Sequence, residues 1–394
     1  MKIGWILILF ALITAVALSI DTISWILDLT GATKIFEEPP VSAYREIVDL
    51  EETDLEELDL EVHAPRVTDQ DFHAGAGLLI YGNDPAFEEK AQLLLNYLIY
   101  LQINSINLSF PIYQDNWTSS GVFVDDELTL SEDNIRFFIR EAHKRNFTVM
   151  VRPVLDEASL YLDNQWRGSI EPEDRESWFQ SYTEIILKYS QLAAEEEADI
   201  MCIGTEFSSL ETETDQWLKL IEEVRSLYGG QLTYSVNWNR TYNGNIEFWE
   251  ELDFIGIDAF FPLDAPLEAT TAELIEAWQP WVEIINDLKA SYNMPVVFTE
   301  IGAVPQAGSY QTPWRWLTMD RADLEVEIDL EAQSNYYAAT CETVYELVNG
   351  IYWWNFELDP PADPENDPSF NPTGKPAANV IRNCFGNRQG FLSN

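Results

Sequence analysis

Positive charge is scarce in this sequence of 394 residues. It contains 22 lysines and arginines against 68 aspartates and glutamates, which gives a formal net charge of -46 at pH 7. Phosphate backbones and anionic lipid headgroups repel a chain with this balance. The composition therefore argues against nucleic-acid binding. It leaves two explanations of the acid excess open, namely adaptation to brine or seawater and the ordinary acidity of a secreted protein.

Cysteines and phosphate-binding glycines are also few. Cys202, Cys341 and Cys384 lack the spacing of metal ligands, and three cysteines cannot all pair within one chain. Cys202 lies in an apolar run, so we expect it to be buried as a small hydrophobic residue. The stretch LLIYGNDPAFEE lacks the glycines of a P-loop or dinucleotide fingerprint. The sequence thus predicts no nucleotide, metal or other cofactor.

The one long apolar run is at the N-terminus, where Lys2 precedes the stretch IGWILILFALITAVALSI. Residues 1–20 are predicted to be an export signal or a membrane anchor. The small residues Ala15 and Ala17 favour cleavage, whereas the length of the run and a second apolar patch, ISWILDL, favour an anchor. Both remain open, and either predicts an exported protein, secreted or tethered to the membrane. Residues 21–71 combine prolines with dense acidic runs and are predicted to be a linker.

From residue 72 to 386, short β-rich runs alternate with amphipathic segments, and residues 387–394 are expected to form a tail. Apolar residues at helical spacing predict helices at 86–101, 131–145, 175–196 and 214–228. Alternating strands and helices indicate a parallel sheet, and eight such units favour a closed (β/α)8 TIM barrel of the α/β class. The eight predicted strands are 75–81, 103–110, 147–155, 199–204, 232–236, 252–260, 294–299 and 350–356.

Function in such a barrel lies at the carboxyl ends of the strands. The sequence places four acids there, Asp156, Glu206, Asp258 and Glu300. An acid at a strand end is often only a helix cap or a solvated loop residue, and for Asp156 and Asp258 that reading has equal weight. Glu206 and Glu300 occupy corresponding points on the fourth and seventh strands and have small neighbours, which favours a catalytic role.

Tryptophans accompany these acids at the strand ends. The C–H faces of a pyranose stack on indole rings, while carboxyl groups act on the glycosidic oxygen and the anomeric carbon, so this combination suits sugar chemistry. Trp353 and Trp354 are adjacent on one strand. One of them must therefore face the mouth of the barrel and the other the surrounding helices.

Six segments within residues 73–386 carry a further signal, namely MCIGTEFSSLE, LTYSVNW, FWEELDFIGIDAFFPL, MPVVFTEIGA, GIYWWNF and NPTGKPAANVIRNCF. In sequence and in order, they resemble the family 113 glycoside hydrolases, the β-mannanase-like members of clan A. The resemblance implies a retaining glycosidase acting on β-1,4-mannan or a related β-glycan through two carboxylates. Glu206 matches the acid/base on strand four, and Glu300 matches the nucleophile on strand seven. Such an enzyme needs one carboxyl group protonated and the other ionised.

The chain departs from the family pattern at the sixth strand, which usually ends in a tyrosine that can reach the nucleophile and here has Phe260. Arg152 is expected either to keep Glu300 ionised or to form a salt bridge with Asp156. A non-catalytic or weakly active carbohydrate-binding barrel at the cell surface is the alternative function, but two strand-end glutamates favour an enzyme. The residues predicted to contact substrate are Trp117, Arg152, Asp156, Thr205, Asn237, Trp238, Asp258, Phe260 and Trp354.

Overall fold

The computed structural model describes residues 72–161, 163–244, 246–315 and 327–389. The predicted signal or anchor and the predicted acidic linker lie outside these residues, as does the end of the predicted tail. Among the described residues, no helix combines the length and the apolar character that a bilayer crossing requires.

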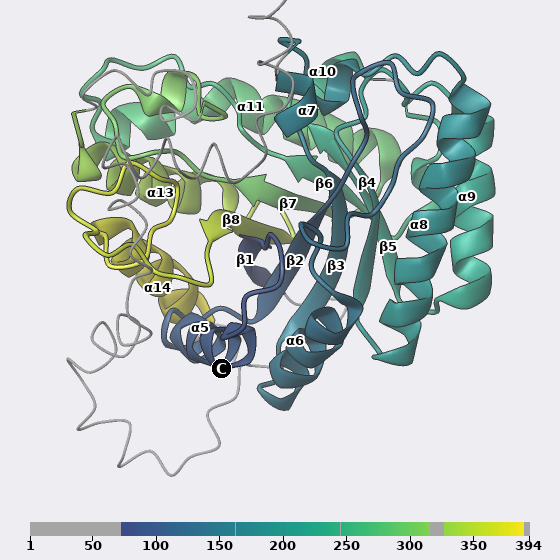
Figure 1. The fold of residues 1–394 in the computed structure, drawn as a ribbon. Coiled ribbons are helices and arrows are strands. Elements are labelled where there is room, and N and C mark those ends of the chain that lie inside the picture. Colours follow the sequence, from purple (N-terminus) through teal and green to yellow (C-terminus); the bar gives the residue numbers. More distant parts are fainter. Residues whose placement is uncertain (1–71, 162, 245, 316–326, 390–394) are drawn as a thin grey trace, which may run out of the picture. The chain divides into compact units, whose positions relative to one another are not determined.

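Eight parallel strands form a closed barrel, in which each strand pairs with the next and β8 pairs with β1 (Figure 1). Every strand overlaps the run predicted for it, which confirms the (β/α)8 fold. The strands are β1 (His73–Leu79), β2 (Ser105–Ile112), β3 (Thr148–Leu155), β4 (Ile200–Thr205), β5 (Gln231–Asn237), β6 (Phe254–Asp258), β7 (Val296–Ile301) and β8 (Gly350–Phe356).

Helices surround the barrel, and the four whose bounds were predicted begin and end within one residue of the prediction. Their apolar faces pack on the strands, and the helices that begin at residues 132, 175, 271 and 330 have side-chain caps at their amino termini. At the start of α11, for example, Thr270 and Glu273 form a capping box. The long helices are α5 (Phe87–Tyr100), α6 (Glu132–Lys144), α8 (Arg175–Glu195), α9 (Thr214–Leu227), α11 (Thr271–Tyr292), α13 (Leu330–Val344) and α14 (Pro376–Gln389).

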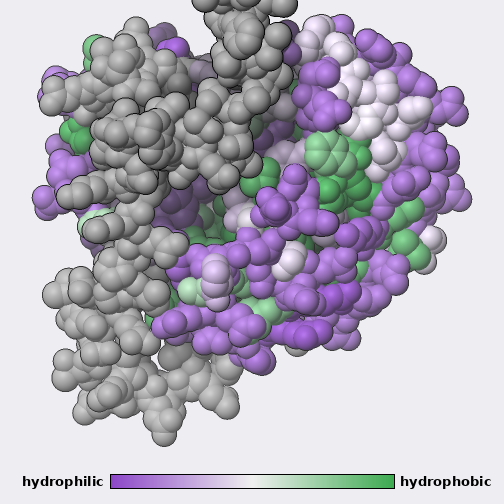
Figure 2. Space-filling model, viewed as in Figure 1, coloured by the Kyte–Doolittle hydropathy of each residue, from purple (hydrophilic) through white to green (hydrophobic). Residues whose placement is uncertain are grey.

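Short helical turns lie on the loops that follow the carboxyl ends of the strands. They are α7 (Ala158–Tyr161) and η2 (Arg167–Ser169) after β3, α10 (Arg240–Asn243) and η3 (Trp249–Glu251) after β5, and η4 (Ser309–Gln311) after β7. In Figure 1, α7 and α10 lie at the upper end of the barrel, opposite α5. Seen from the same side, hydrophilic residues cover most of the described surface (Figure 2).

A disulfide between Cys341 and Cys384 joins α13 to α14 and spans 43 residues of sequence. Cys202 is a free and fully buried cysteine, as predicted. It packs inside the barrel with apolar residues that include Met150 and Tyr352. The disulfide therefore closes a loop on the outer helical layer, away from the interior of the barrel.

Candidate active site

Glu206 follows β4 directly, and its backbone is held in an unusual conformation. Its φ angle of 56° lies in the left-handed region, which residues other than glycine adopt rarely. The backbone N–H donates to the carbonyl of Ser235 at 2.8 Å, and the carbonyl accepts from the N–H of Ser208 at 2.7 Å. Backbone strain of this kind persists where the surroundings fix it, and it is concentrated at functional sites. The strand end therefore holds the Glu206 side chain in one direction.

Glu206 is 8% exposed as a whole residue, and its carboxyl group has one donor on each oxygen. Asn237 Nδ2 donates to Oε1 at 2.6 Å, and Arg167 Nη1 donates to Oε2 at 3.1 Å. Burial, followed by the negative charge of Asp258, raises the pKa of Glu206 to about 7, although Arg167 and Asn237 act in the opposite direction. A carboxyl group with this pKa can give and take a proton near neutral pH.

Glu300 lies near the end of β7 and is 5% exposed. Arg152 Nη1 lies 2.8 Å from its Oε1 and forms an ion pair with it. Burial and then the charge of Asp258 raise the pKa of Glu300 well above its ordinary value, and the Arg152 guanidinium opposes this rise. Three carboxyl groups, those of Glu206, Asp258 and Glu300, thus share the site with two guanidinium groups. A proton taken up near neutral pH belongs to this cluster as a whole.

Arg152 and Asp258 are both completely buried and form the base of the cluster. Arg152 Nη2 donates to Asp258 Oδ2 at 2.7 Å, and its Nε donates to Thr205 Oγ1 at 3.0 Å. The hydroxyl of Thr299 donates to the other Asp258 oxygen at 2.8 Å. Burial raises the pKa of Asp258, and Arg152 is the largest opposing influence. The sequence offered Glu300 and Asp156 as partners of Arg152, and the structure pairs Arg152 with Glu300.

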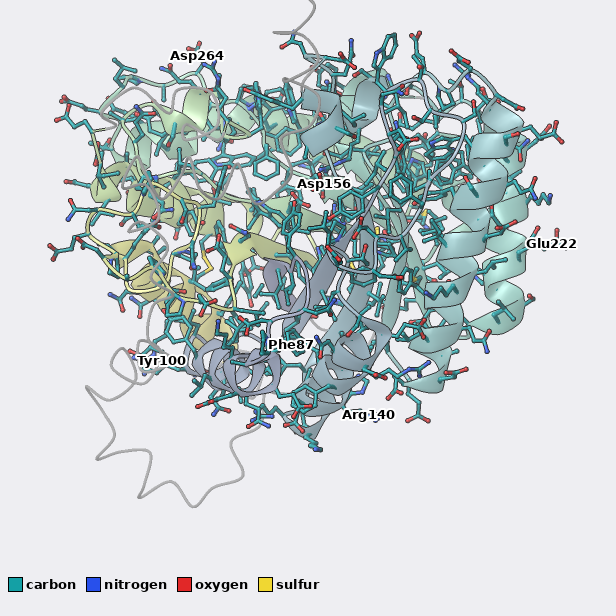
Figure 3. The ribbon with its side chains drawn as sticks, viewed as in Figure 1. Phe87, Tyr100, Arg140, Asp156, Glu222 and Asp264 are labelled. Atoms are coloured by element: carbon teal, nitrogen blue, oxygen red, sulfur yellow. A yellow bond between two sulfur atoms is a disulfide. The ribbon has the colours of Figure 1, made fainter. Side chains whose placement is uncertain are left out.

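Asp156 has different neighbours. Its Oδ2 accepts from the hydroxyl of Tyr81 at 2.7 Å, and its Oδ1 accepts from the N–H of Ala158 at the start of α7. The salt bridge considered between Asp156 and Arg152 is therefore wrong, and the helix-cap reading of Asp156 describes its contacts. Figure 3 places Asp156 inside the upper part of the molecule, with Arg140 and Tyr100 near the opposite end.

Aromatic residues cover part of the same region. Trp354 and Phe260 belong to one buried cluster with Val304 and Phe370, and Trp238 packs against it. Trp353 faces away and stacks on Tyr337 of α13, with ring centroids 4.2 Å apart. The prediction that the two adjacent tryptophans face opposite sides is thus confirmed.

Phe260 contacts Phe370 edge-on, with ring centroids 6.2 Å apart, where the family pattern has a tyrosine. Trp117 is partly buried and packs against the main hydrophobic core. Its carbonyl accepts from the N–H of Glu171, so the contacts described for it link it to the loop before α8.

Arg167 is the member of the site that the sequence did not reveal. It begins η2, and its Nε donates to the carbonyl of Leu155 at 3.1 Å and lies 3.3 Å from a carboxyl oxygen of Glu157. These contacts aim Nη1 at Glu206. Arg167 does not follow a strand, so a search of strand ends misses it. The one signal was the presence of an arginine in a loop of a chain with few cations.

Comparison with known proteins identifies one matching family. The model of Glycoside Hydrolase Family 113 matches residues 83–375. None of the curated proteins matches the sequence.

Several solved structures share the fold. The structure of a family 113 β-mannanase from Alicyclobacillus acidocaldarius in complex with ManMIm is 23% identical, covers 80% of this chain and 98% of its own, and has a TM-score of 0.70. A second family 113 structure, of a β-1,4-mannanase, is 24% identical over 80% of this chain and 99% of its own, with a TM-score of 0.69. A family 5 mannosidase from Rhizomucor miehei is more distant, with 10% identity, coverage of 85% and 99%, and a TM-score of 0.51.

Proposed function

The chain belongs to glycoside hydrolase family 113, and from this premise we propose that it is a retaining β-glycosidase acting on β-1,4-mannan or a related β-glycan. The family makes it a mannanase-like glycoside hydrolase. The observation that carries the finer proposal is the pair of buried glutamates at the ends of β4 and β7, within one cluster of carboxyl and guanidinium groups. Double displacement requires two such carboxyl groups.

In the first step the Glu300 carboxylate attacks the anomeric carbon, and Glu206 gives its proton to the glycosidic oxygen as the C–O bond breaks. The products are the free leaving group and a glycosyl ester of Glu300. In the second step Glu206 takes a proton from water, and the resulting nucleophile releases the sugar and restores Glu300. Burial raises the pKa of both glutamates, and the Arg152 guanidinium paired with Glu300 opposes that rise, which supports an ionised Glu300 and a protonated Glu206 at the first step.

We assign Arg152, Asp258 and Thr205 to the positioning of Glu300. Direct contact with substrate, which the sequence suggested for them, remains a prediction, but their complete burial favours an indirect role. Arg152 contacts both acids and the threonine, so its guanidinium has a fixed plane. A fixed guanidinium directs the Glu300 oxygens without a cost of reorganisation during the reaction.

Sugar stacking falls to the aromatic residues at the mouth. Trp354 is 6% exposed and Phe260 is 7% exposed, so each presents only a small part of its ring. Asn237 offers an amide beside Glu206, and Asp156 and Trp117 are further candidates for contacts with substrate. These assignments follow from location, and each remains a prediction.

Phe260 motivates the alternative function, a carbohydrate-binding barrel with little or no turnover. Its ring lies in an apolar cluster and supplies no hydroxyl donor to the nucleophile. An assay for cleavage products distinguishes the enzyme from the binding protein. Purified full-length protein is incubated with β-mannan, glucomannan, cellulose, xylan and aryl β-glycosides, and the products are separated and identified.

Two variants then test the mechanism. Glu300→Gln should abolish turnover of every substrate. Glu206→Ala should still react with substrates whose leaving group needs no proton, and azide should then yield a β-glycosyl azide. An azide adduct of inverted configuration, or equal losses on activated and unactivated substrates, would contradict the retaining mechanism with these roles.

We further propose that the protein is exported, with residues 1–20 as signal or anchor, 21–71 as linker and 72–389 as the barrel, because α14 extends to Gln389 and so takes in the first three residues of the predicted tail, 387–394. The disulfide between Cys341 and Cys384 supports this location, because disulfides persist in oxidising compartments. The test is to fractionate the producing cells and to determine the N-terminal residue of the mature chain. Intact Met1 in a cytoplasmic fraction with reduced Cys341 would contradict export.

A further inference from the structure

Among the described residues, the exposed aromatic side chains all lie on the loops that follow the strands. They come after β1, β2, β3, β5 and β7, which places them on the face of the barrel that carries the two glutamates. The long helices expose none. Exposed aromatic rings that are confined to one face of a protein with a net charge of -46 favour a binding surface there. These residues, with exposures of 42% to 54%, are Tyr81, Phe123, Tyr161, Tyr242 and Trp314.

Trp314 differs from the others in having a stacked partner. It lies on the loop between β7 and α13, and its ring stacks on that of Trp238 at the end of β5, with centroids 5.5 Å apart and planes inclined by 18°. Trp281 of α11 contacts Trp238 edge-on at 5.6 Å. Trp238 is thus held from two sides and supports Trp314, which remains 42% exposed. The arrangement fixes one indole ring at the surface.

The stack of Trp238 and Trp314 lies on the same side of the site as Glu206. Trp238 adjoins Asn237, whose amide donates to Glu206 at 2.6 Å. Trp238 also packs against the cluster that contains Trp354 and Phe260. An aromatic surface therefore runs from the cluster near the glutamates to Trp314 at the rim. Under the proposed function, Glu206 protonates the leaving oxygen, so side chains beside Glu206 face the departing part of the substrate.

We propose that Trp314, supported by Trp238, is a stacking platform for a sugar unit on the leaving-group side of the cleaved bond. The inference rests on the proposed function and extends it. The ligand is a β-linked glycan chain that continues beyond the unit released first, and its pyranose face packs on the exposed indole ring. A substrate with a small leaving group does not reach this ring.

The test is the dependence of kcat/KM on substrate length. Wild type, Trp314→Ala and Trp314→Phe are compared on β-1,4-linked manno-oligosaccharides of two to six units and on an aryl β-mannoside. For the longest oligosaccharides, Trp314→Ala should lower kcat/KM roughly three- to tenfold, the range that aromatic stacking provides. The loss should be much smaller for the aryl mannoside, and Trp314→Phe should retain part of the effect. Leu227→Ala is the control, because Leu227 is 46% exposed but ends α9 at the opposite face.

A second measurement separates this inference from the catalytic proposal. Native electrophoresis in gels containing soluble glucomannan reports binding without turnover, and Glu300→Gln alone is compared with Glu300→Gln combined with Trp314→Ala. Weaker retardation of the double variant than of Glu300→Gln alone supports the platform, whether or not the wild type cleaves oligosaccharides. Absence of cleavage by the wild type would refute only the catalytic proposal. Equal losses on all substrate lengths, or equal retardation of the two variants, would overturn the platform.

Discussion

Removal of Arg167 should move the alkaline limit of activity to higher pH. The Arg167→Gln variant replaces a guanidinium that lies 3.1 Å from Glu206 with a neutral amide. Glu206 must be protonated to assist the leaving group, so kcat/KM falls as pH rises through its pKa, which is about 7. Arg167 stabilises the ionised form and lowers this pKa. Without Arg167, Glu206 keeps its proton to higher pH.

The magnitude follows from the contact distance and the burial. Both side chains are largely buried, with exposures of 14% for Arg167 and 10% for Glu206, so solvent screens the pair weakly. Unit charges about 4 Å apart interact by about 4 kcal/mol at an effective dielectric constant near 20, and 1.36 kcal/mol corresponds to one pKa unit. Water that enters the vacated space offsets part of this interaction. We therefore expect the pKa of Glu206 to rise by about 1 to 3 units, the usual effect of an adjacent opposite charge.

The assay is the pH profile of kcat/KM on an unactivated oligosaccharide, with Arg167→Lys as the matched control. Lysine keeps the positive charge, so its alkaline limit should remain close to that of the wild type even if the rate falls. A merely structural role of Arg167 would lower the rate of both variants without moving the limit of either. An Arg167→Gln enzyme that is active and keeps the wild-type limit would refute the electrostatic reasoning.

Three further results are expected. Replacement of both Cys341 and Cys384 by serine should lower the free energy of unfolding by about 4 kcal/mol, because the disulfide closes a loop of 43 residues. For a domain of about 300 residues, the melting temperature should then fall by roughly 6 °C. An unchanged melting temperature under matched conditions would contradict this. If the acid excess is an adaptation to brine, the melting temperature should rise with added salt as self-repulsion is screened, and a flat or falling trend counts against it. Phe260→Tyr restores the hydroxyl that the family pattern has at the end of the sixth strand, and its effect on activity or on the pH profile should be on the order of 1 to 3 kcal/mol. If neither responds, the residue does not reach Glu300.

Regular structure was predictable because each strand and helix carries its own periodic signal. The strand that ends at Thr205 is an apolar run that closes with Gly204 and Thr205 before the acid Glu206, and the helix that follows Ser131 has a cap and an apolar stripe. Such patterns lie within a few neighbouring residues, and interactions among these residues determine where a strand or a helix begins. The order of the strands then follows, because consecutive parallel units lie side by side.

Contacts between distant loops were less predictable. The position of Arg167 depends on the path of a loop that ties it to Leu155 and Glu157, and no periodic pattern records that path. The pairing of Cys341 with Cys384 likewise depends on how α13 packs on α14. For Arg152, the sequence offered two partners, and only the register of β3 beside its neighbours places it against Glu300.

The direction of β1 has a practical consequence for handling the protein on surfaces. The strand begins at His73, at the end of the barrel opposite the glutamates, and its seven residues extend about 20 Å toward the mouth. A bead, a fusion partner or a bilayer attached at His73 therefore lies next to the amino-terminal face of the barrel. The mouth is left unobstructed by the attachment point. For the proposed activity on a glycan polymer, attachment at His73 is thus the orientation to choose, and attachment through the loops after the strands is the one to avoid.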